Sequence, residues 1–212
     1  FFKINISCEI LFNISMSCYS FNGFIPVVDP SSYIHDTASV IGDVIIGKDC
    51  YVGPGAVIRG DWGRIIIEDG CNVQENCVVH MFPGKHITFE SGAHIGHGAV
   101  VHGATLKSNC LIGMNAVIMD GAIVGKNSIV GALSFVKAEE IIPDNHLFAG
   151  NPGRIIKEIS QEMIEWKTEG TALYQSLPSS CHSSLLPVAP LTSIEDNRPS
   201  HEMVYKTWKT RQ

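Results

Sequence analysis

The sequence predicts an all-β solenoid of six-residue repeats that ends in a C-terminal α-helix packed along it. The first observation is a six-residue spacing of aliphatic side chains that runs, with interruptions, to Val136. The second is that the side chain four residues after each aliphatic position is usually small. Three hexads form one triangular coil of about 18 residues, so the series predicts about six stacked coils with an aliphatic core. The uninterrupted part of the series is Ile34, Val40, Ile46, Val52 and Ile58.

The repeat is interrupted at three places. RGDWGR at 59–64 carries three extra residues, MFPGKH at 81–86 inserts a short loop, and the series slips by one residue before Leu106. Glycine often follows directly after the aliphatic position, where we expect a tight corner with positive φ. These glycines are Gly47, Gly53, Gly96, Gly113, Gly125 and Gly131.

Composition limits the classes of partner. A chain of 212 residues, 45% apolar and 17% charged, suits one globular domain with an appendage. The net charge of −6 argues against a nucleic-acid partner, and no apolar run reaches membrane-spanning length. Seven cysteines without a CxxC pair favour neither a disulfide framework nor a cysteine zinc site, so we expect a reducing, cytoplasmic location. Four of them stand at the small-residue position and are expected to be buried: Cys50, Cys71, Cys77 and Cys110.

Four segments are expected along the chain. Residues 1–15 lack the repeat and read as an N-terminal extension without function, and residues 16–150 form the β-helix domain. Residues 151–185 form a C-terminal helical segment, because apolar residues recur there at three, four and seven positions. Gly170 and Thr171 mark a place where that helix could divide in two. Residues 186–212 have three prolines and no period, so a loosely ordered tail is expected.

Three histidines are the candidate metal ligands. Three neutral imidazoles around a divalent cation leave a fourth position for water. His80 and His102 are one coil plus the extra loop apart, so both stack on one face of the prism. His97 precedes His102 by nearly one hexad and emerges on a neighbouring face, so a trimer would be needed to bring all three to one ion. The alternative is that all three are surface or interface histidines without a metal.

Four polar residues on the preceding coil accompany the histidines. Arg59 and Asp61 lie in the three-residue surplus, where they form either an ion pair that joins subunits or a part of the catalytic site. Asn72 and Gln74 follow on the same coil, and Gln74 is expected to orient a water molecule at the metal. For Arg59 and Asp61 a structural and a catalytic role are both open, whereas for Gln74 a functional role is favoured.

Taken together, RGD at 59–61, NVQEN at 72–76, HIGHGAVVHG at 94–103 and GMNAVIMDGA at 113–122 resemble the γ-class carbonic anhydrase family. The likeness is strongest to a branch with members in phenylacetic acid degradation and in the carnitine operon, and it covers about residues 16–199. It implies a left-handed parallel β-helix and a homotrimer with Zn²⁺, or Fe²⁺ or Co²⁺, at the subunit interfaces. It also implies that His80, His97 and His102 bind the metal, and that residues equivalent to Arg59, Asp61 and Gln74 complete the site.

The resemblance implies hydration of carbon dioxide to bicarbonate by zinc-activated water. The archetypal enzyme has an acidic loop for proton transfer, whereas here Trp62 follows Asp61 and the loop after His80 has no carboxylate, so slow hydration is expected. Tyr174 on the C-terminal helix either borders the site or is a packed helix residue. Three alternatives stay open: an acyl-CoA thioesterase at the same metal, a hexapeptide-repeat acyltransferase, and a non-enzymatic trimeric scaffold.

Overall fold

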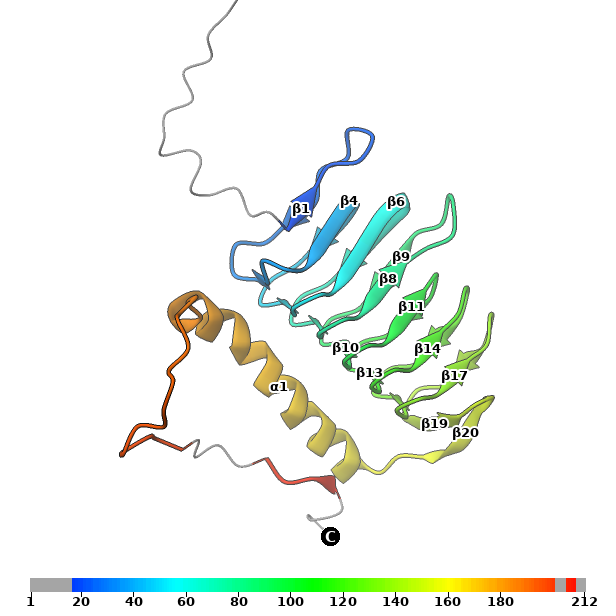
Figure 1. The fold of residues 1–212 in the computed structure, drawn as a ribbon. Coiled ribbons are helices and arrows are strands. Elements are labelled where there is room, and N and C mark those ends of the chain that lie inside the picture. Colours follow the sequence, from blue (N-terminus) through cyan, green and yellow to red (C-terminus); the bar gives the residue numbers. More distant parts are fainter. Residues whose placement is uncertain (1–16, 201–204, 209–212) are drawn as a thin grey trace, which may run out of the picture.

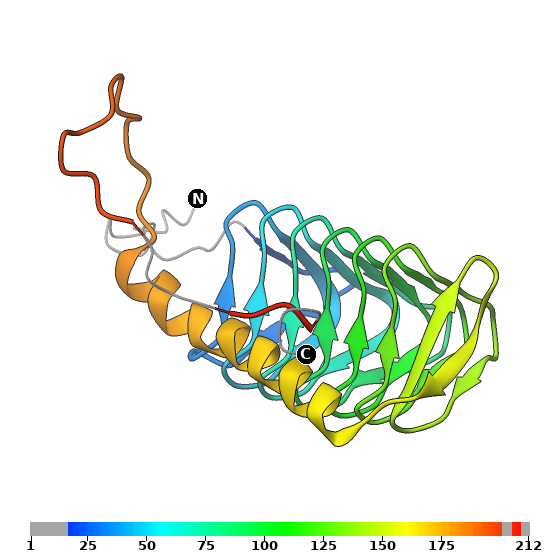
Figure 2. The same ribbon diagram turned by 90° about the horizontal axis from the view of Figure 1, so that it is seen from below.

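The computed structural model describes residues 17–200 and 205–208, so the expected N-terminal extension lies outside the described residues. It is a left-handed parallel β-solenoid of about seven turns with a single helix along its side (Figures 1 and 2). The predicted fold class is therefore confirmed. The strands are β1 Cys18–Tyr19, β2 Val27–Val28, β3 Tyr33–Ile34, β4 Ser39–Ile46, β5 Tyr51–Val52, β6 Val57–Ile67, β7 Asn72–Val73, β8 Val78–His80, β9 Ile87–Phe89, β10 His94–Ile95, β11 Val100–His102, β12 Thr105–Leu106, β13 Leu111–Ile112, β14 Val117–Ile118, β15 Ile123–Val124, β16 Ile129–Val130, β17 Phe135–Val136, β18 Ile141–Ile142, β19 His146–Gly150 and β20 Gly153–Glu158.

Strand register shows how the three irregularities are absorbed. In the regular part of the prism, Leu111 pairs with Ile129, 18 residues on. Across the RGDWGR surplus, β5 pairs with β7 at a spacing of 21 residues, and across the loop at 81–86 His80 pairs with His102 at a spacing of 22. The RGDWGR surplus is thus taken up inside β6 as a register shift against β4, and residues 81–86 form a loop between β8 and β9. The slip before Leu106 shortens the spacing to 17 residues, because Leu106 pairs with Phe89.

The interior is a column of aliphatic side chains with cysteines in the small positions. Ile58, Val79 and Val101 are fully buried, and the four cysteines expected inside are buried as well. Burial raises the pKa of the Cys110 thiol to about 12. These cysteines therefore act as compact core residues.

The glycines after the aliphatic positions have a different role from the expected one. None of the six has a positive φ. A Cβ on Gly113 would lie 2.4 Å from the backbone nitrogen of Ala132 on the next coil, so close stacking of coils excludes a side chain there. The left-handed corner conformation falls two residues further on, at Asp49, Gly55, Gly98, Asn115, Asn127 and Leu133.

The helix α1, Gln161–Ser184, runs back along the face formed by β3, β5, β7, β10, β13, β16 and β19 (Figure 2). It is one continuous helix of 24 residues, so Gly170 does not divide it. Ser160 caps its first turn by accepting a hydrogen bond from the Met163 amide. The segment expected to be helical from residue 151 begins instead with β20, which pairs antiparallel with β19.

Part of the C-terminal tail returns to α1. The Tyr205 hydroxyl donates to the Trp166 carbonyl at 2.8 Å, and Trp208 packs against the Trp166 ring. Among the described residues, no helix is long and apolar enough to cross a membrane.

Candidate metal centre

Two of the candidate ligands meet on one face of the prism. His80 ends β8 and His102 ends β11, and the two residues are paired in register. The His80 Nδ1 and His102 Nε2 atoms are 3.1 Å apart, and the ring centroids are 5.1 Å apart. The stacking predicted from the 22-residue spacing is therefore seen in the structure.

A carboxylate holds the opposite nitrogen of each of these rings. His80 Nε2 is 2.9 Å from Asp61 Oδ1, and His102 Nδ1 is 2.7 Å from Asp120 Oδ1. Because an ionised carboxylate only accepts hydrogen bonds, each of these nitrogens donates to its carboxylate. The other two nitrogens, His80 Nδ1 and His102 Nε2, face each other, and a shared proton or a cation between them would join the two rings.

Arg59 supports this pair from β6. Its NH1 group donates to Asp61 Oδ2 at 2.5 Å, so Asp61 bridges Arg59 and His80. Burial alone would raise the pKa of Asp61, but the hydrogen bonds from His80 and Arg59 outweigh burial and hold that pKa below its usual value. The Arg59 guanidinium also lies over the Trp62 ring, which is half exposed and 5.0 Å from the His80 ring.

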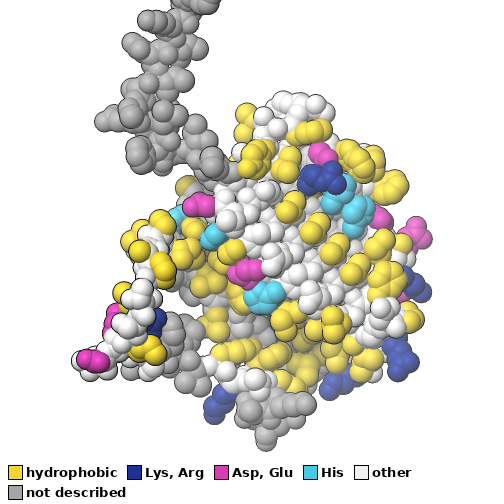
Figure 3. Space-filling view, in the orientation of Figure 1, with side chains coloured by type: hydrophobic (Ala, Val, Ile, Leu, Met, Phe, Trp, Pro, Cys, Tyr) yellow, Lys and Arg dark blue, Asp and Glu magenta, His cyan; other side chains and the backbone are white. Residues whose placement is uncertain are grey.

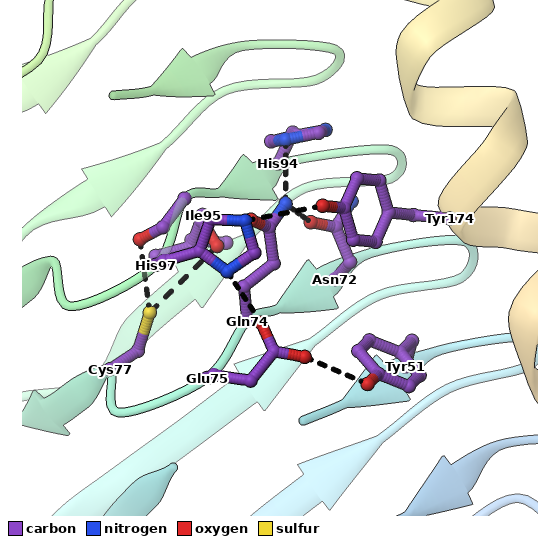
Figure 4. A network of polar contacts seen from close by, with 10 residues as sticks. Tyr51, Asn72, Gln74, Glu75, Cys77, His94, Ile95, His97 and Tyr174 are labelled. Carbon is purple, nitrogen blue, oxygen red and sulfur yellow. Dashed lines mark hydrogen bonds and ion pairs between the residues drawn. The ribbon is translucent and has the colours of Figure 1, made fainter. Parts of the chain in front are cut away.

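His97 lies apart from the other two histidines, after β10, on the side covered by α1. Its Nδ1 atom bonds to Glu75 Oε2, and the other oxygen of Glu75 accepts from the Tyr51 hydroxyl at 3.0 Å (Figure 4). The other ring nitrogen, Nε2, hydrogen-bonds to the Tyr174 hydroxyl at 3.4 Å. The Tyr174 side chain thus reaches His97, and burial followed by the nearby Glu75 charge raises the pKa of Tyr174.

Asn72 and Gln74 lie between His97 and the helix. The Gln74 Nε2 atom donates to Asn72 Oδ1 at 2.8 Å and lies 2.7 Å from His94 Nε2. Both amide side chains are about 1% exposed, and Asn72 Nδ2 has no hydrogen-bond partner. Neither residue contacts His80 or His102 within the chain, so these polar residues form a second group around His97.

The side chains present fit a divalent metal. Two nitrogens bound to one tetrahedral Zn²⁺ lie roughly 3.3 Å apart, close to the separation of His80 Nδ1 and His102 Nε2. Each of the three histidines also has its other nitrogen on a carboxylate, as metal-bound histidines usually do. Within one chain, over residues 17–200 and 205–208, no three ligand side chains come together. Among these described residues, His80 and His102 therefore stand as a pair without a third ligand side chain.

Comparison with known proteins identifies the family. The chain is 45% identical over 184 residues to the carnitine operon protein CaiE of Escherichia coli strain K12, which covers 87% of this chain and 94% of that protein. It belongs to the CaiE family of hexapeptide-repeat proteins. The family model described as "Bacterial transferase hexapeptide (six repeats)" matches residues 26–60 and 103–138.

Two solved structures share the fold of this CaiE-family chain. A hexapeptide transferase family protein from Anaplasma phagocytophilum is 31% identical, with a TM-score of 0.74 over 77% of this chain and 96% of that one. A Bacillus cereus protein described as a candidate acetyltransferase is also 31% identical, with a TM-score of 0.77 over 80% and 98% of the two chains. Both proteins are similar to this CaiE-family chain over most of its length.

A cavity of about 520 Å³ opens beside His97 in this CaiE-family protein. Its floor includes Gly96, Gly113 and Gly131 from three stacked coils, and Tyr205 lies at one wall. The rest of the lining is mostly apolar or aromatic and comes from both the prism and α1: Leu111, Met114, Ile129, Trp166, Leu173 and Tyr174. Its polar and charged lining residues are Gln74, His94, His97 and Lys167.

Sequence reasoning did not place three residues that bond to this CaiE-family group of side chains: Glu75, His94 and Asp120. Asp120 stands 18 residues after His102, one regular coil, so the repeat spacing could have placed it beside that histidine. Glu75 precedes His97 by 22 residues, the same spacing as His80 and His102, which was the available signal. For His94 no such signal exists, because its partners come from α1 as well as from the neighbouring coil.

Proposed function

We propose that this chain forms a homotrimeric, metal-dependent enzyme that hydrates carbon dioxide to bicarbonate, in the manner of γ-class carbonic anhydrases. The observation that carries this proposal is the approach of His80 Nδ1 and His102 Nε2 to 3.1 Å, with Asp61 and Asp120 behind the two rings. Two imidazoles held in this way could supply two of the three protein ligands of a catalytic metal site. The likeness to the carnitine operon proteins supports a place for the reaction in carnitine catabolism rather than in phenylacetate catabolism.

The metal would be Zn²⁺, with Fe²⁺ or Co²⁺ as alternatives that imidazole ligands also suit. It would be held by His80 and His102 of one chain and by His97 of the partner subunit. When bound, such an ion supplies the Lewis acidity that makes water nucleophilic near neutral pH. Exposed apolar side chains near His80, among them Trp62, Val78 and Phe82, support an interface between copies at this surface. Figure 3 shows histidine and basic side chains amid hydrophobic ones on this face.

The chain's own residues would hold and orient the reacting groups. Arg59 and Asp61 fix the His80 ring, and Glu75 fixes the His97 ring with Nε2 turned toward Tyr174. Gln74 faces the cavity beside His97, where it would accept a hydrogen bond from the attacking water. Tyr174 borders His97 and would close one side of the site.

We expect mixed trimers to recover activity that neither parent variant has. A His97→Ala chain keeps His80 and His102, whereas a His80→Ala/His102→Ala chain keeps His97. Each mixed trimer then contains one intact interface out of three, so mixed trimers purified through both tags should have about one third of the wild-type sites. Co-expression of the two variants with different tags, followed by double affinity purification, metal analysis and hydration assays, measures this. Mixed trimers with no more metal and activity than the two parent variants would contradict a shared site.

Proton transfer should limit the rate of hydration. The carboxylates beside the three histidines, Asp61, Glu75 and Asp120, are each already bonded to a histidine, so none of these three is free to carry protons away. We expect a modest hydration rate that rises several-fold when an imidazole buffer is added as an external proton acceptor. Stopped-flow hydration across buffer concentrations is the test. A fast rate that does not depend on the buffer would show that the chain contains its own proton path.

A second candidate is hydrolysis of an acyl-CoA thioester at the same metal, and the cavity beside His97 favours it. A volume of about 520 Å³ with apolar walls is far more than carbon dioxide needs and is within the usual range for small organic ligands. Release of free thiol from short-chain and aryl acyl-CoA, measured on the same metal-loaded protein, separates the two reactions. Thiol release without hydration would favour the thioesterase, and inactivity in both assays would favour a trimeric scaffold. An acyltransferase is a weaker candidate, because the loop at 81–86 is too short to cover an acceptor.

A further inference from the structure

A series of hydrogen bonds links four buried polar side chains from helix α1 to the cavity beside His97. Thr171 Oγ1 of α1 is 3.3 Å from His94 Nδ1, and His94 Nε2 is 2.7 Å from Gln74 Nε2. Gln74 Nε2 in turn is bonded to Asn72 Oδ1. All four residues are at most 9% exposed, so solvent water does not compete for these hydrogen bonds. Figure 4 shows His94 and Asn72 on either side of the Gln74 amide.

In this series of hydrogen bonds, the donor and acceptor roles in one bond determine the roles in the next. The Thr171 hydroxyl donates to the Lys167 carbonyl one turn earlier, which leaves its oxygen to accept from His94 Nδ1–H. Burial, followed by the charges of Lys167 and His97, lowers the pKa of His94 to about 3, so the ring is neutral and has one N–H. His94 Nε2 must then accept, and Gln74 must present its NH₂ group to it. The remaining polar atom of Gln74 is its carbonyl oxygen, Oε1.

Gln74 and His97 line the same cavity, so the orientation of this amide matters at the candidate site. An outward carbonyl oxygen accepts a hydrogen bond, whereas an outward NH₂ group donates one. A water that attacks an electrophilic carbon has O–H groups to donate, so an acceptor orients it with a lone pair toward the substrate. The choice between the two orientations is made by His94 and Thr171, neither of which is a candidate metal ligand.

We propose that His94 and Thr171 are positioning residues that hold the Gln74 amide with its carbonyl oxygen toward the cavity, where it orients the attacking water. The role in catalysis rests on the proposed function, but the orientation of the amide does not. Without the Thr171 hydroxyl, no acceptor would hold the proton of His94 on Nδ1, so the ring could also adopt the Nε2–H form. The Nε2–H form would then require Gln74 to turn its carbonyl to His94 and its NH₂ group to the cavity.

The test compares Thr171→Val, which keeps the shape of the side chain, with Thr171→Ser, which keeps the hydroxyl. Thr168→Val is the matched control, because Thr168 lies on the same helix and contacts Asn109 rather than His94. In metal-loaded protein labelled with ¹⁵N in histidine and glutamine, the wild type should show His94 in the Nδ1–H form and a Gln74 amide that exchanges slowly. Thr171→Val should shift His94 toward the Nε2–H form and speed exchange of the Gln74 amide. Thr171→Ser and Thr168→Val should resemble the wild type.

Activity is the second measurement. At unchanged metal content, turnover of the reaction that the wild type catalyses should fall by about tenfold or more in Thr171→Val and recover in Thr171→Ser. Unchanged ¹⁵N spectra of His94 and Gln74 in Thr171→Val would overturn the positioning role whatever the activity. Altered spectra with full activity would overturn its link to the attacking water. An inactive wild type with altered variant spectra would instead count against the proposed function and support the positioning of the amide.

Discussion

Replacing His102 with Ala is expected to remove most of the bound metal and to lower hydration at least about 100-fold, with the β-structure intact. The imidazole supplies one of two converging lone pairs, while the core that stabilises the solenoid is aliphatic and does not include it. We expect the same result for His80→Ala and His97→Ala. Metal analysis beside circular dichroism measures both quantities on one sample.

His146→Ala is the control for these variants. His146 is partly exposed at the start of β19, where its ring bonds only to the Asp144 carbonyl, so metal content should not change. Wild-type metal levels in all three ligand variants would show that the ligand assignment is wrong. Loss of metal together with loss of β-structure would show instead that these histidines stabilise the fold.

Acid is expected to destabilise the protein through His94 well before the carboxylates titrate. The folded pKa is about 3, against about 6.5 for an unfolded histidine, so below pH 6.5 the unfolded chain binds a proton that the folded chain excludes. The free energy of unfolding should therefore be highest above pH 6.5 and fall by about 1.4 kcal/mol for each pH unit below it. Between pH 6.5 and pH 5 this amounts to about 2 kcal/mol for each chain, and the decline should level off near pH 3.

The measurement is urea unfolding at a fixed protein concentration, because association shifts apparent stability. His94→Gln removes the titrating group at similar size, so its stability should be lower at pH 7 but should vary less between pH 6.5 and pH 5. His146→Gln should retain the wild-type slope. An equal pH slope in the wild type and in His94→Gln would rule out His94 as the source of the acid sensitivity.

The residues around His97 show where sequence reasoning reached its limit. The face of His97 follows from counting hexads, and the structure does separate it from His80 and His102. Its bond to Glu75 was not expected from the sequence, whereas the bond between Arg59 and Asp61 was one of the two expected roles of that pair. The spacing gives the coil and the face of a residue, but a hydrogen-bond partner is decided by side-chain direction within about 3 Å. The assignment of these residues to a metal stays a proposal.

The glycines after the aliphatic positions give a second example. Their places in the hexad were plain from the sequence, yet they were expected to permit positive φ. In the structure they permit close approach instead, since a Cβ on Gly113 would meet the backbone of the next coil. The sequence shows that these positions have no side chain, whereas only the structure shows that the backbone of the next coil excludes one.

By itself, the sequence determined the solenoid, its aliphatic core, the three irregularities in the repeat and the stacking of His80 on His102. These properties depend on periodic burial, which a linear spacing records directly. Only the tertiary structure decided that Asp61, Glu75 and Asp120 each hold one histidine, and that α1 places Thr171 against His94 and Tyr174 against His97. Those contacts join residues on different coils or, for α1, residues 77 positions apart, and their partners are fixed by how the helix docks on the prism.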